Sequence, residues 1–153
     1  FTLPNADAGG RELGRIVESY VAHRANACVH ASLGQLRYFS CLSQVDAVVG
    51  NSSSGLTEVP SFKKGTVNIG DRQGGRVSGA SVINCEPDQA SISTAIRYLY
   101  SPGFQSSLAG VSNPYGDGGA SEKIVEVIRS FPLKGLTKKT FYDVHISYIA
   151  RGA

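Results

Sequence analysis

Short apolar runs alternate along this chain with longer stretches in which apolar residues recur at helical spacing. The runs at residues 46–50, 66–70 and 81–85 are brief and apolar, which is typical of strands buried on both faces of a parallel sheet. Strands that alternate with helices are joined by right-handed crossovers, so they form such a sheet. The sequence therefore predicts an α/β domain with an open, doubly wound parallel sheet of the Rossmann-like kind.

Helical periodicity fills the segments between these runs. Helices are expected around residues 13–21, 34–45, 92–100 and 124–128, with further strands at 27–32 and, in part, at 1–3. The helix at 34–45 would direct Leu36, Phe39 and Leu42 to one side. Residues 132–153 are basic and then apolar, and they fit no place in the sheet. We therefore expect a domain at residues 1–131 and a tail at 132–153 that packs on this domain or on a missing lobe.

Composition narrows the classes of function. The 153 residues suit one domain, and because the chain begins with Phe1 and contains no Met, we expect a piece of a longer protein. The net charge of +3 is mild and the basic residues form no block, so nucleic-acid binding is not expected. Membrane insertion is not expected either, because no apolar run is long enough to span a bilayer.

The cysteines bear on the redox compartment. Cys28, Cys41 and Cys85 are odd in number and lack the spacing of a metal site. We expect free, buried thiols in a reducing, cytoplasmic setting, and a disulfide between two of them is the less favoured alternative. The sequence contains no P-loop, no zinc spacing and no G-x-G-x-x-G fingerprint.

The strand expected at 46–50 runs directly into the polar stretch "NSSSGLTE". A strand, a tight turn, small polar residues and a helix start expose backbone N–H groups, and the helix dipole adds partial positive charge, so this layout suits a phosphate. Ser52 and Ser53 can donate hydroxyl hydrogen bonds to phosphate oxygens. Glu58 can accept two hydrogen bonds from a sugar diol, and phosphate with diol indicates a nucleotide. The alternative is that the serines only cap a helix and Glu58 is a surface residue.

Two further loops are expected at the same edge of the sheet. Arg72 and Arg76 lie in the glycine-rich loop at 68–79, and an arginine fork suits diphosphate oxygens. The alternative for this loop is a mobile surface with solvated arginines. The segment at 113–119 is either a second backbone cradle or, as we prefer, a structural connection that orients the last helix. Asn5 would lie at the same edge if the chain opens with the end of a strand.

Five motifs occur in an order and at a spacing that resemble the C-terminal half of the hydrolysing UDP-N-acetylglucosamine 2-epimerases of the sialic acid synthesis type. They are "PNADAGGREL", "SLGQLRYFSCL", "VVGNSSSGLTEVPSF", "TVNIGDRQGGR" and "NPYGDGGAS". The resemblance runs from Phe1 to about Ile128. It implies the second of two Rossmann-type lobes in a glycosyltransferase-B-like fold, with the active site between the lobes. It also implies a reaction that releases UDP by elimination and then adds water to the unsaturated sugar, with no metal and no nicotinamide cofactor.

The resemblance further implies that seven residues of this chain bind the nucleotide. They are Asn5 at the cleft, the Leu33 backbone and Tyr38 at the uracil, Ser52 and Ser53 at the phosphates, Glu58 at the ribose and Arg72 near the diphosphate. The family's acid and base carboxylates belong to the first lobe, so no catalytic residue is assigned in this chain. Gly65 stands where the family usually has proline, which would loosen that turn.

Three functions therefore stay open. The first is the nucleotide-binding lobe of an enzyme that converts UDP-N-acetylglucosamine and water to N-acetylmannosamine and UDP. The second is the same family acting on a related sugar such as UDP-diacetylbacillosamine, and the third is a UDP-binding module without catalysis. Each takes UDP or a UDP-sugar. The resemblance implies as partners the N-terminal lobe of the same protein and, in the full-length protein, a second copy in a homodimer.

Overall fold

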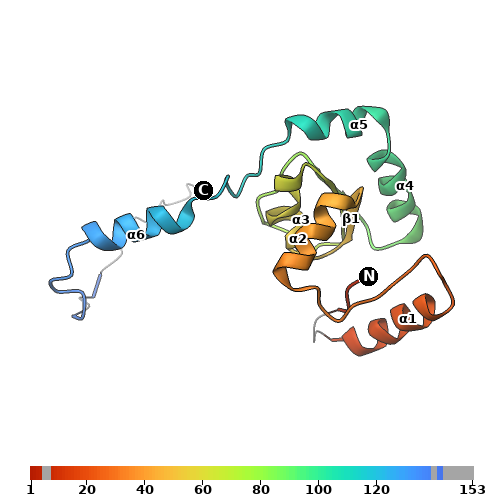
Figure 1. Ribbon diagram of the computed structural model, residues 1–153, viewed down its shortest axis with the longest axis horizontal. Coiled ribbons are helices and arrows are strands. Elements are labelled where there is room, and N and C mark those ends of the chain that lie inside the picture. The colour runs from red at the N-terminus through yellow and green to blue at the C-terminus, as the bar shows by residue number, and fades with distance from the viewer. Residues whose placement is uncertain (5–7, 139–140, 143–153) are drawn as a thin grey trace, which may run out of the picture. The chain divides into compact units, whose positions relative to one another are not determined.

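The computed structural model describes residues 1–4, 8–138 and 141–142, and the chain divides into two compact units, Phe1–Asp117 and Gly118–Ala153 (Figure 1). The first unit contains α1 (Gly10–Ala22), α2 (Gly34–Gln44), β1 (Ala47–Gly50), α3 (Ser54–Thr57), the 3-10 helix η1 (Val59–Phe62), β2 (Gly65–Ile69), β3 (Val82–Cys85), α4 (Gln89–Leu99), α5 (Pro102–Ser107) and the 3-10 helix η2 (Leu108–Gly110). The described part of the second unit contains α6 (Ala120–Ser130). The division at residue 117 falls earlier than the expected boundary at residue 131, and the packing of residues 132–153 stays a prediction.

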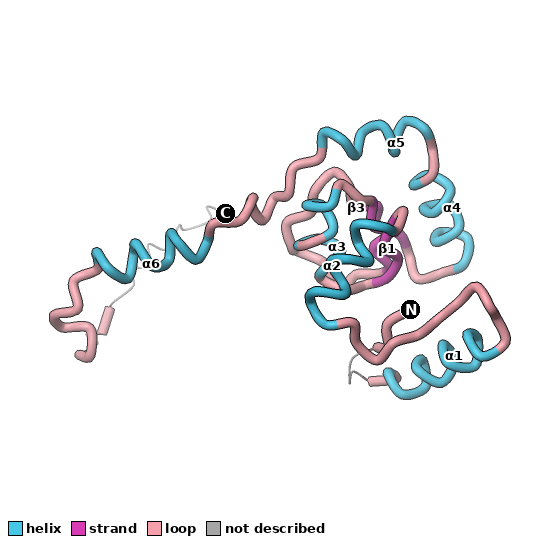
Figure 2. Tube along the Cα trace, in the orientation of Figure 1, coloured by secondary structure: helices cyan, strands magenta, loops and turns pink. Residues whose placement is uncertain are grey.

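Within the described residues, the strands form an open parallel sheet in the order β1-β2-β3. Val67 of β2 lies opposite Val49 of β1 and opposite Ile83 of β3. Figure 2 shows the strands at the centre of the first unit with helices around them. Because all strands run the same way, their carboxyl ends meet at one edge of the sheet. The predicted Rossmann-like α/β architecture is confirmed.

Helices cover both faces of the sheet. On one face, Val67 packs in a buried cluster with Ala95 and Leu99 of α4, and Phe104 of α5 belongs to the same cluster. On the other face, the Thr66 hydroxyl donates a hydrogen bond to the Gly55 carbonyl of α3 at 2.9 Å. Successive residues of a strand point to opposite faces, so β2 is buried from both sides. This two-sided burial is the doubly wound arrangement that the sequence predicted.

One predicted strand is absent from the described part of the chain, and one predicted helix is covered only in part. Among the described residues, the segment at 27–32 forms only an isolated bridge, between His30 and Thr2, because the short N-terminal segment is its only described pairing partner. Leu36 is 82% exposed although Leu42, two turns later in α2, is buried. The covered part of α2 is its second half, where the ring of Phe39 lies 5.5 Å from that of Phe62.

The cysteine prediction was half right. All three cysteines are free thiols, as expected, but Cys28 and Cys41 are exposed and Cys85 is only half-buried. Cys28 lies in the segment at 27–32, which forms no strand, and Cys41 lies on the exposed side of α2.

In the described part of the chain, no helix combines the length and apolarity that crossing a membrane requires.

Two glycines allow close approaches that a larger residue would prevent. A Cβ atom at Gly65 would lie 2.9 Å from Phe104 Cε1 and 3.1 Å from Leu99 Cδ1. A Cβ at Gly55 would lie 2.6 Å from Thr66 Cγ2. Gly65 therefore lets α4 and α5 pack closely against the start of β2. This is a packing role, separate from the looser turn that the sequence predicted for this position. Gly55 lets α3 lie directly on the sheet.

Gly55→Ala is expected to lower the free energy of unfolding by about 1–3 kcal/mol, because the added methyl group overlaps Thr66 and overpacking costs this much. The control is Gly103→Ala in α5, where a Cβ meets nothing within 4 Å. That variant should be neutral or gain up to about 1 kcal/mol from helix propensity. Urea denaturation measures both, and equal stabilities of the two variants would contradict the close packing of α3 on β2.

Candidate functional site

The serine segment, Asn51–Ser54, leads from β1 into a very short helix. The helix α3 has only four residues, and Glu58 separates it from η1. Pro60 explains the early end, because a longer α-helix would need its missing N–H to bond the Leu56 carbonyl. A single turn aligns few peptide dipoles, so the contribution of the helix dipole to anion binding, which stays a prediction, is smaller than that of a longer helix.

The backbone of the serine segment is folded back on itself. The Ser54 N–H donates to Ser52 Oγ at 3.4 Å, and the Gly55 N–H donates to the Ser52 carbonyl at 3.2 Å. Leu56 N–H donates to the Ser53 carbonyl at 2.9 Å. Ser52 is exposed and Ser53 is half-buried. The N–H groups of Ser54, Gly55 and Leu56 are therefore engaged within the segment, and the Ser52 and Ser53 hydroxyls are among the groups that can meet an anion here.

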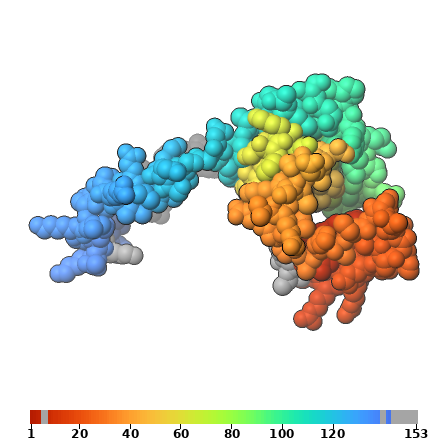
Figure 3. Space-filling model, viewed as in Figure 1, coloured from red at the N-terminus to blue at the C-terminus, as the bar shows by residue number. Residues whose placement is uncertain are grey.

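Tyr38 connects α2 to this segment. Its hydroxyl lies 2.5 Å from Ser54 Oγ, and its side chain is half-buried. Burial raises the pKa of Tyr38 above its ordinary value, the hydrogen bond with Ser54 lowers it, and the negative charge of Glu58 raises it further. Figure 3 shows the orange surface of α2 beside the yellow surface of the residues that follow β1. Tyr38 therefore stays neutral and lies near both the serines and Glu58.

Glu58 combines burial with an unsatisfied acceptor. The residue is half-buried, and its Oε2 atom is enclosed without a hydrogen-bond partner among the described residues. A buried polar atom without a partner destabilises the folded state by roughly 1–3 kcal/mol. Because Oε2 is enclosed, the side chain has to turn outward before a sugar hydroxyl can bond to it. The half-buried side chain argues against Glu58 as a plain surface residue, and its binding of a sugar diol stays a prediction.

The loop after β2 reaches back to the serine segment. Gln73 Nε2 donates to the Asn51 carbonyl at 2.7 Å, and Arg72 donates from Nη1 to the same carbonyl at 3.3 Å. Arg72 is exposed, whereas Gln73 is 6% exposed and its Oε1 has no partner among the described residues. The loops after β1 and β2 are thus joined at one backbone oxygen, which places the Arg72 guanidinium beside the serines.

Sequence reasoning missed Gln73 and the Asn51 carbonyl. The glycine-rich loop reads as polar and exposed, and nothing in its composition marks one amide as buried. The signal that could have identified Gln73 is its position directly after Arg72 in the sequence.

Leu33 is half-buried and precedes α2 as its N-cap residue, more than one turn before Tyr38. Asn5 lies outside the described residues.

The structure thus brings Tyr38, Ser52–Ser54, Glu58 and Arg72 together around the carboxyl ends of β1 and β2. Arg76 lies farther along the same glycine-rich loop and is exposed. The arrangement offers hydroxyl donors, one guanidinium and one carboxylate acceptor within connected segments. It can hold an anion next to a diol. Within the described residues, no cluster of histidine, cysteine and carboxylate side chains could hold a metal ion.

A second concave surface lies on the other face of the sheet. It is an open groove of about 990 Å³ at the ends of β2 and β3, and its lining includes Asp71, Cys85, Glu86 and Tyr98. Burial raises the pKa of the Cys85 thiol, and the charges of Asp88 and Glu86 raise it further. A raised pKa disfavours the thiolate, so this cysteine is a poor nucleophile. Carboxylates in this groove also make it less suited to phosphate than the serine side.

Tyr38→Phe is expected to reduce the loss of stability at high pH. The folded chain favours the neutral phenol, so its pKa lies above the ordinary 10.0. Stability from this shift is fully present below about pH 10 and is lost as the pH rises through the folded-state pKa. Thermal denaturation between about pH 8 and 11 measures the effect. The control, Tyr98→Phe, removes a tyrosine that is 55% exposed; identical pH profiles for all three proteins would contradict the burial of Tyr38.

Comparison with known proteins places this chain in a family. The family model for UDP-N-acetylglucosamine 2-epimerase matches residues 1–129. The chain is 38% identical over 146 residues to polysialic acid biosynthesis protein P7 of Escherichia coli, covering 94% of this chain and 37% of that protein. It is 34% identical over 146 residues to GDP/UDP-N,N'-diacetylbacillosamine 2-epimerase (hydrolyzing) of Campylobacter jejuni, covering 94% and 38%.

A third relative agrees with these. The chain is 33% identical over 131 residues to UDP-N,N'-diacetylbacillosamine 2-epimerase (hydrolyzing) of Legionella pneumophila, covering 85% of this chain and 33% of that protein. The chain thus spans between 33% and 38% of the length of these relatives. The region matched by the family model includes the whole of the site described above, from Tyr38 to Arg72. The resemblance inferred from the sequence motifs is confirmed, and the chain belongs to the UDP-N-acetylglucosamine 2-epimerase family.

Proposed function

We propose that this chain is the nucleotide-binding domain of a hydrolysing UDP-N-acetylglucosamine 2-epimerase and binds UDP at the carboxyl edge of its sheet. The parent protein would convert UDP-N-acetylglucosamine and water to N-acetylmannosamine and UDP. The observation that supports this most is the meeting of Ser52, Arg72 and Glu58 around the end of β1. Arg72 is held beside the serines through the Asn51 carbonyl, and Glu58 carries an acceptor oxygen without a described partner.

In this proposal each group meets a different part of UDP. The Ser52 and Ser53 hydroxyls and the Arg72 guanidinium bind the diphosphate, because charge-assisted and bidentate hydrogen bonds suit phosphate oxygens. The Glu58 carboxylate accepts from the ribose diol. Tyr38 and the Leu33 backbone lie toward the uracil, with the tyrosine hydroxyl bonded to Ser54. The family resemblance adds Asn5, which lies outside the described residues, to this proposal. No residue of this chain is assigned to proton transfer.

Two alternatives keep the same nucleotide and change the rest. The Campylobacter and Legionella relatives are named for diacetylbacillosamine, which favours a related sugar as the second candidate. The third candidate is a UDP-binding module without catalysis. Assays of the parent protein with both UDP-sugars separate the first two, and turnover of either sugar excludes the third.

The unpaired thiols support a reducing, cytoplasmic setting. The N-terminal lobe as partner and a homodimer of the parent belong to the same proposal.

UDP is expected to bind the 153-residue chain weakly, and Glu58→Ala should weaken this binding. A hydrogen bond to a charged group contributes about 1.5–3 kcal/mol, so Kd should rise about ten- to a hundredfold. Isothermal titration calorimetry measures the change. The matched control is Glu18→Ala, which removes an exposed carboxylate on α1. Equal affinities of the Glu58 variant and the unaltered chain would remove Glu58 from the site.

The nucleotide itself offers a second control for the same prediction. A uridine diphosphate that lacks the 2′-hydroxyl should bind the unaltered chain less tightly than UDP does. In Glu58→Ala the two nucleotides should bind alike, because the group that distinguishes them is gone. A persistent preference for UDP in the variant would place the diol elsewhere. AMP serves as the control for the base.

The chain alone is expected to produce no N-acetylmannosamine from UDP-N-acetylglucosamine. Removal of a proton from the sugar needs a positioned base within hydrogen-bond reach, and the resemblance places the family's acid and base outside this sequence. Product analysis by chromatography after prolonged incubation tests this. The relative from Neisseria meningitidis that is named UDP-N-acetylglucosamine 2-epimerase is the positive control. Product above the level of a protein-free sample would show that this chain carries the chemistry itself.

A further inference from the structure

The segment Val111–Tyr115, here called the strap, crosses from the buried core to both loops of the candidate site. Val111 is 4% exposed and belongs to the same cluster as Val67. This burial anchors the start of the strap beneath α4 and α5. The carbonyl of Val111 accepts a hydrogen bond from Lys63 Nζ, just after η1. The strap therefore begins from a fixed point of the first unit.

Asn113 of the strap holds the turn that carries Glu58. Its Nδ2 donates to the Thr57 carbonyl at 2.8 Å and to Ser61 Oγ at 2.7 Å. Thr57 directly precedes Glu58, and Ser61 follows it within one helical turn. Asn113 Oδ1 is also used, because it accepts from the Tyr115 N–H at 2.9 Å. One amide side chain thus links both sides of the Glu58 turn to Tyr115.

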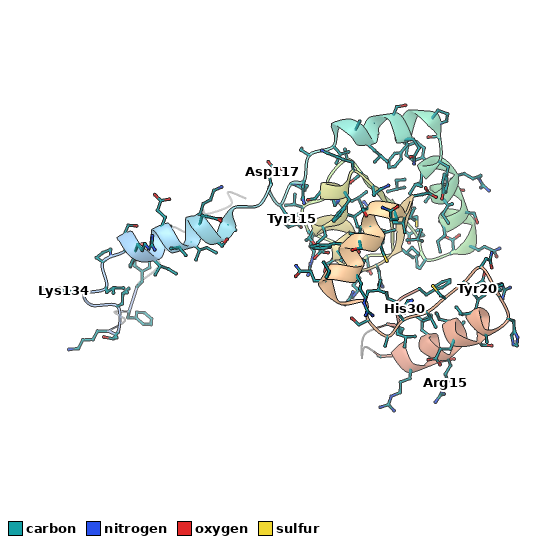
Figure 4. All side chains as sticks on the ribbon, viewed as in Figure 1. Arg15, Tyr20, His30, Tyr115, Asp117 and Lys134 are labelled. Atoms are coloured by element: carbon teal, nitrogen blue, oxygen red, sulfur yellow. The ribbon has the colours of Figure 1, made fainter. Side chains whose placement is uncertain are left out.

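Tyr115 holds the other loop. Its hydroxyl donates to the Val77 carbonyl at 3.0 Å, and Val77 follows Arg76 in the glycine-rich loop. Pro114 lies against the end of this loop, since a Cβ at Gly79 would come within 3.3 Å of Pro114 Cδ. Figure 4 labels Tyr115, which lies on the side of the first unit that carries α3. The glycine-rich loop is therefore fixed at its start through Gln73 and near its end through Tyr115.

We propose that Asn113 and Tyr115 are positioning residues of the nucleotide site, which fix the Glu58 turn and the arginine loop relative to each other. This inference rests on the proposed function, because a ligand that meets both Glu58 and Arg72 requires a fixed separation between them. A loop rich in glycine loses much conformational freedom when it is ordered. If the strap orders the loop before the ligand arrives, that entropic cost does not weaken binding.

Tyr115→Phe tests the strap with the smallest change, because it removes one hydroxyl from a side chain that is 47% exposed. UDP should bind this variant of the 153-residue chain roughly threefold to tenfold less tightly in calorimetry, the effect of one hydrogen bond. The matched control is Tyr100→Phe, which removes the hydroxyl that donates to Asp46 Oδ2 at 3.3 Å, away from the strap. The control should bind UDP as the unaltered chain does.

A double-mutant cycle with Arg72→Ala separates positioning from general stability. If Tyr115 acts through the loop that carries Arg72, its removal should have little further effect on UDP affinity once Arg72 is gone. If Tyr115→Phe instead weakened binding by destabilising the whole fold, its effect on UDP affinity would add to the effect of Arg72→Ala. Additive losses, or equal affinities of Tyr115→Phe and the unaltered chain, would overturn the inference.

Backbone relaxation of ¹⁵N-labelled protein without UDP provides a readout independent of binding. Tyr115→Phe should lower the order parameters of the amides from Arg72 to Gly79, and Tyr100→Phe should not. If the unaltered chain fails to bind UDP, the proposed function fails, and this experiment alone decides whether the strap orders the loop. Unchanged order parameters in Tyr115→Phe would overturn the strap even if UDP binds. Asn113→Ala should lower the order of the Glu58 turn in the same experiment.

Discussion

The structure depends on β2, the central strand of the described sheet, because β1 and β3 both pair with it. Residues 65–68 of this strand are buried, because α3 covers one face and α4 the other. Its register places Asn68 opposite Gly50, so Asn51 comes next to the loop that begins at Gly70. A shift by one residue would turn Val67 from the apolar cluster to the polar face, which burial on both sides forbids. The packing of one strand therefore fixes the distance between the loops that carry the serines and the arginine.

The candidate site carries polar groups that do not stabilise the chain by themselves. Glu58 Oε2 and Gln73 Oε1 are enclosed without described partners, although most buried polar atoms in proteins are hydrogen-bonded. The surroundings hold these groups in place, through Gln73 on the Asn51 carbonyl and Asn113 on the Thr57 carbonyl. Polar groups kept buried at a structural cost, at the edge where doubly wound sheets bind ligands, are what a nucleotide site requires.

The sequence predicted the sheet well because its strands are short apolar runs that end at glycine or at a turn. The principal helices followed from periodicity, as with α4. The segment at 27–32 looked similar to the other runs, but a strand also needs a partner, and composition does not reveal one. The helix start expected after the serines is present, and Pro60 ends that helix after about one turn. Ser52, Glu58 and Arg72 were found from motif spacing. Gln73, Asn113 and Tyr115 were not, because their partners lie 22, 56 and 38 residues away in sequence.

The central claim is that UDP binds on the serine side of the sheet rather than in the groove beside α4. The most direct test is a titration of ¹⁵N-labelled chain with UDP, with AMP as control, followed through amide chemical shifts. The account predicts shifts that cluster on Ser52, Ser53, Glu58 and Arg72 with UDP and not with AMP. Shifts centred on Cys85, Glu86 and Tyr98, or no UDP-specific shifts in a folded chain, would contradict it.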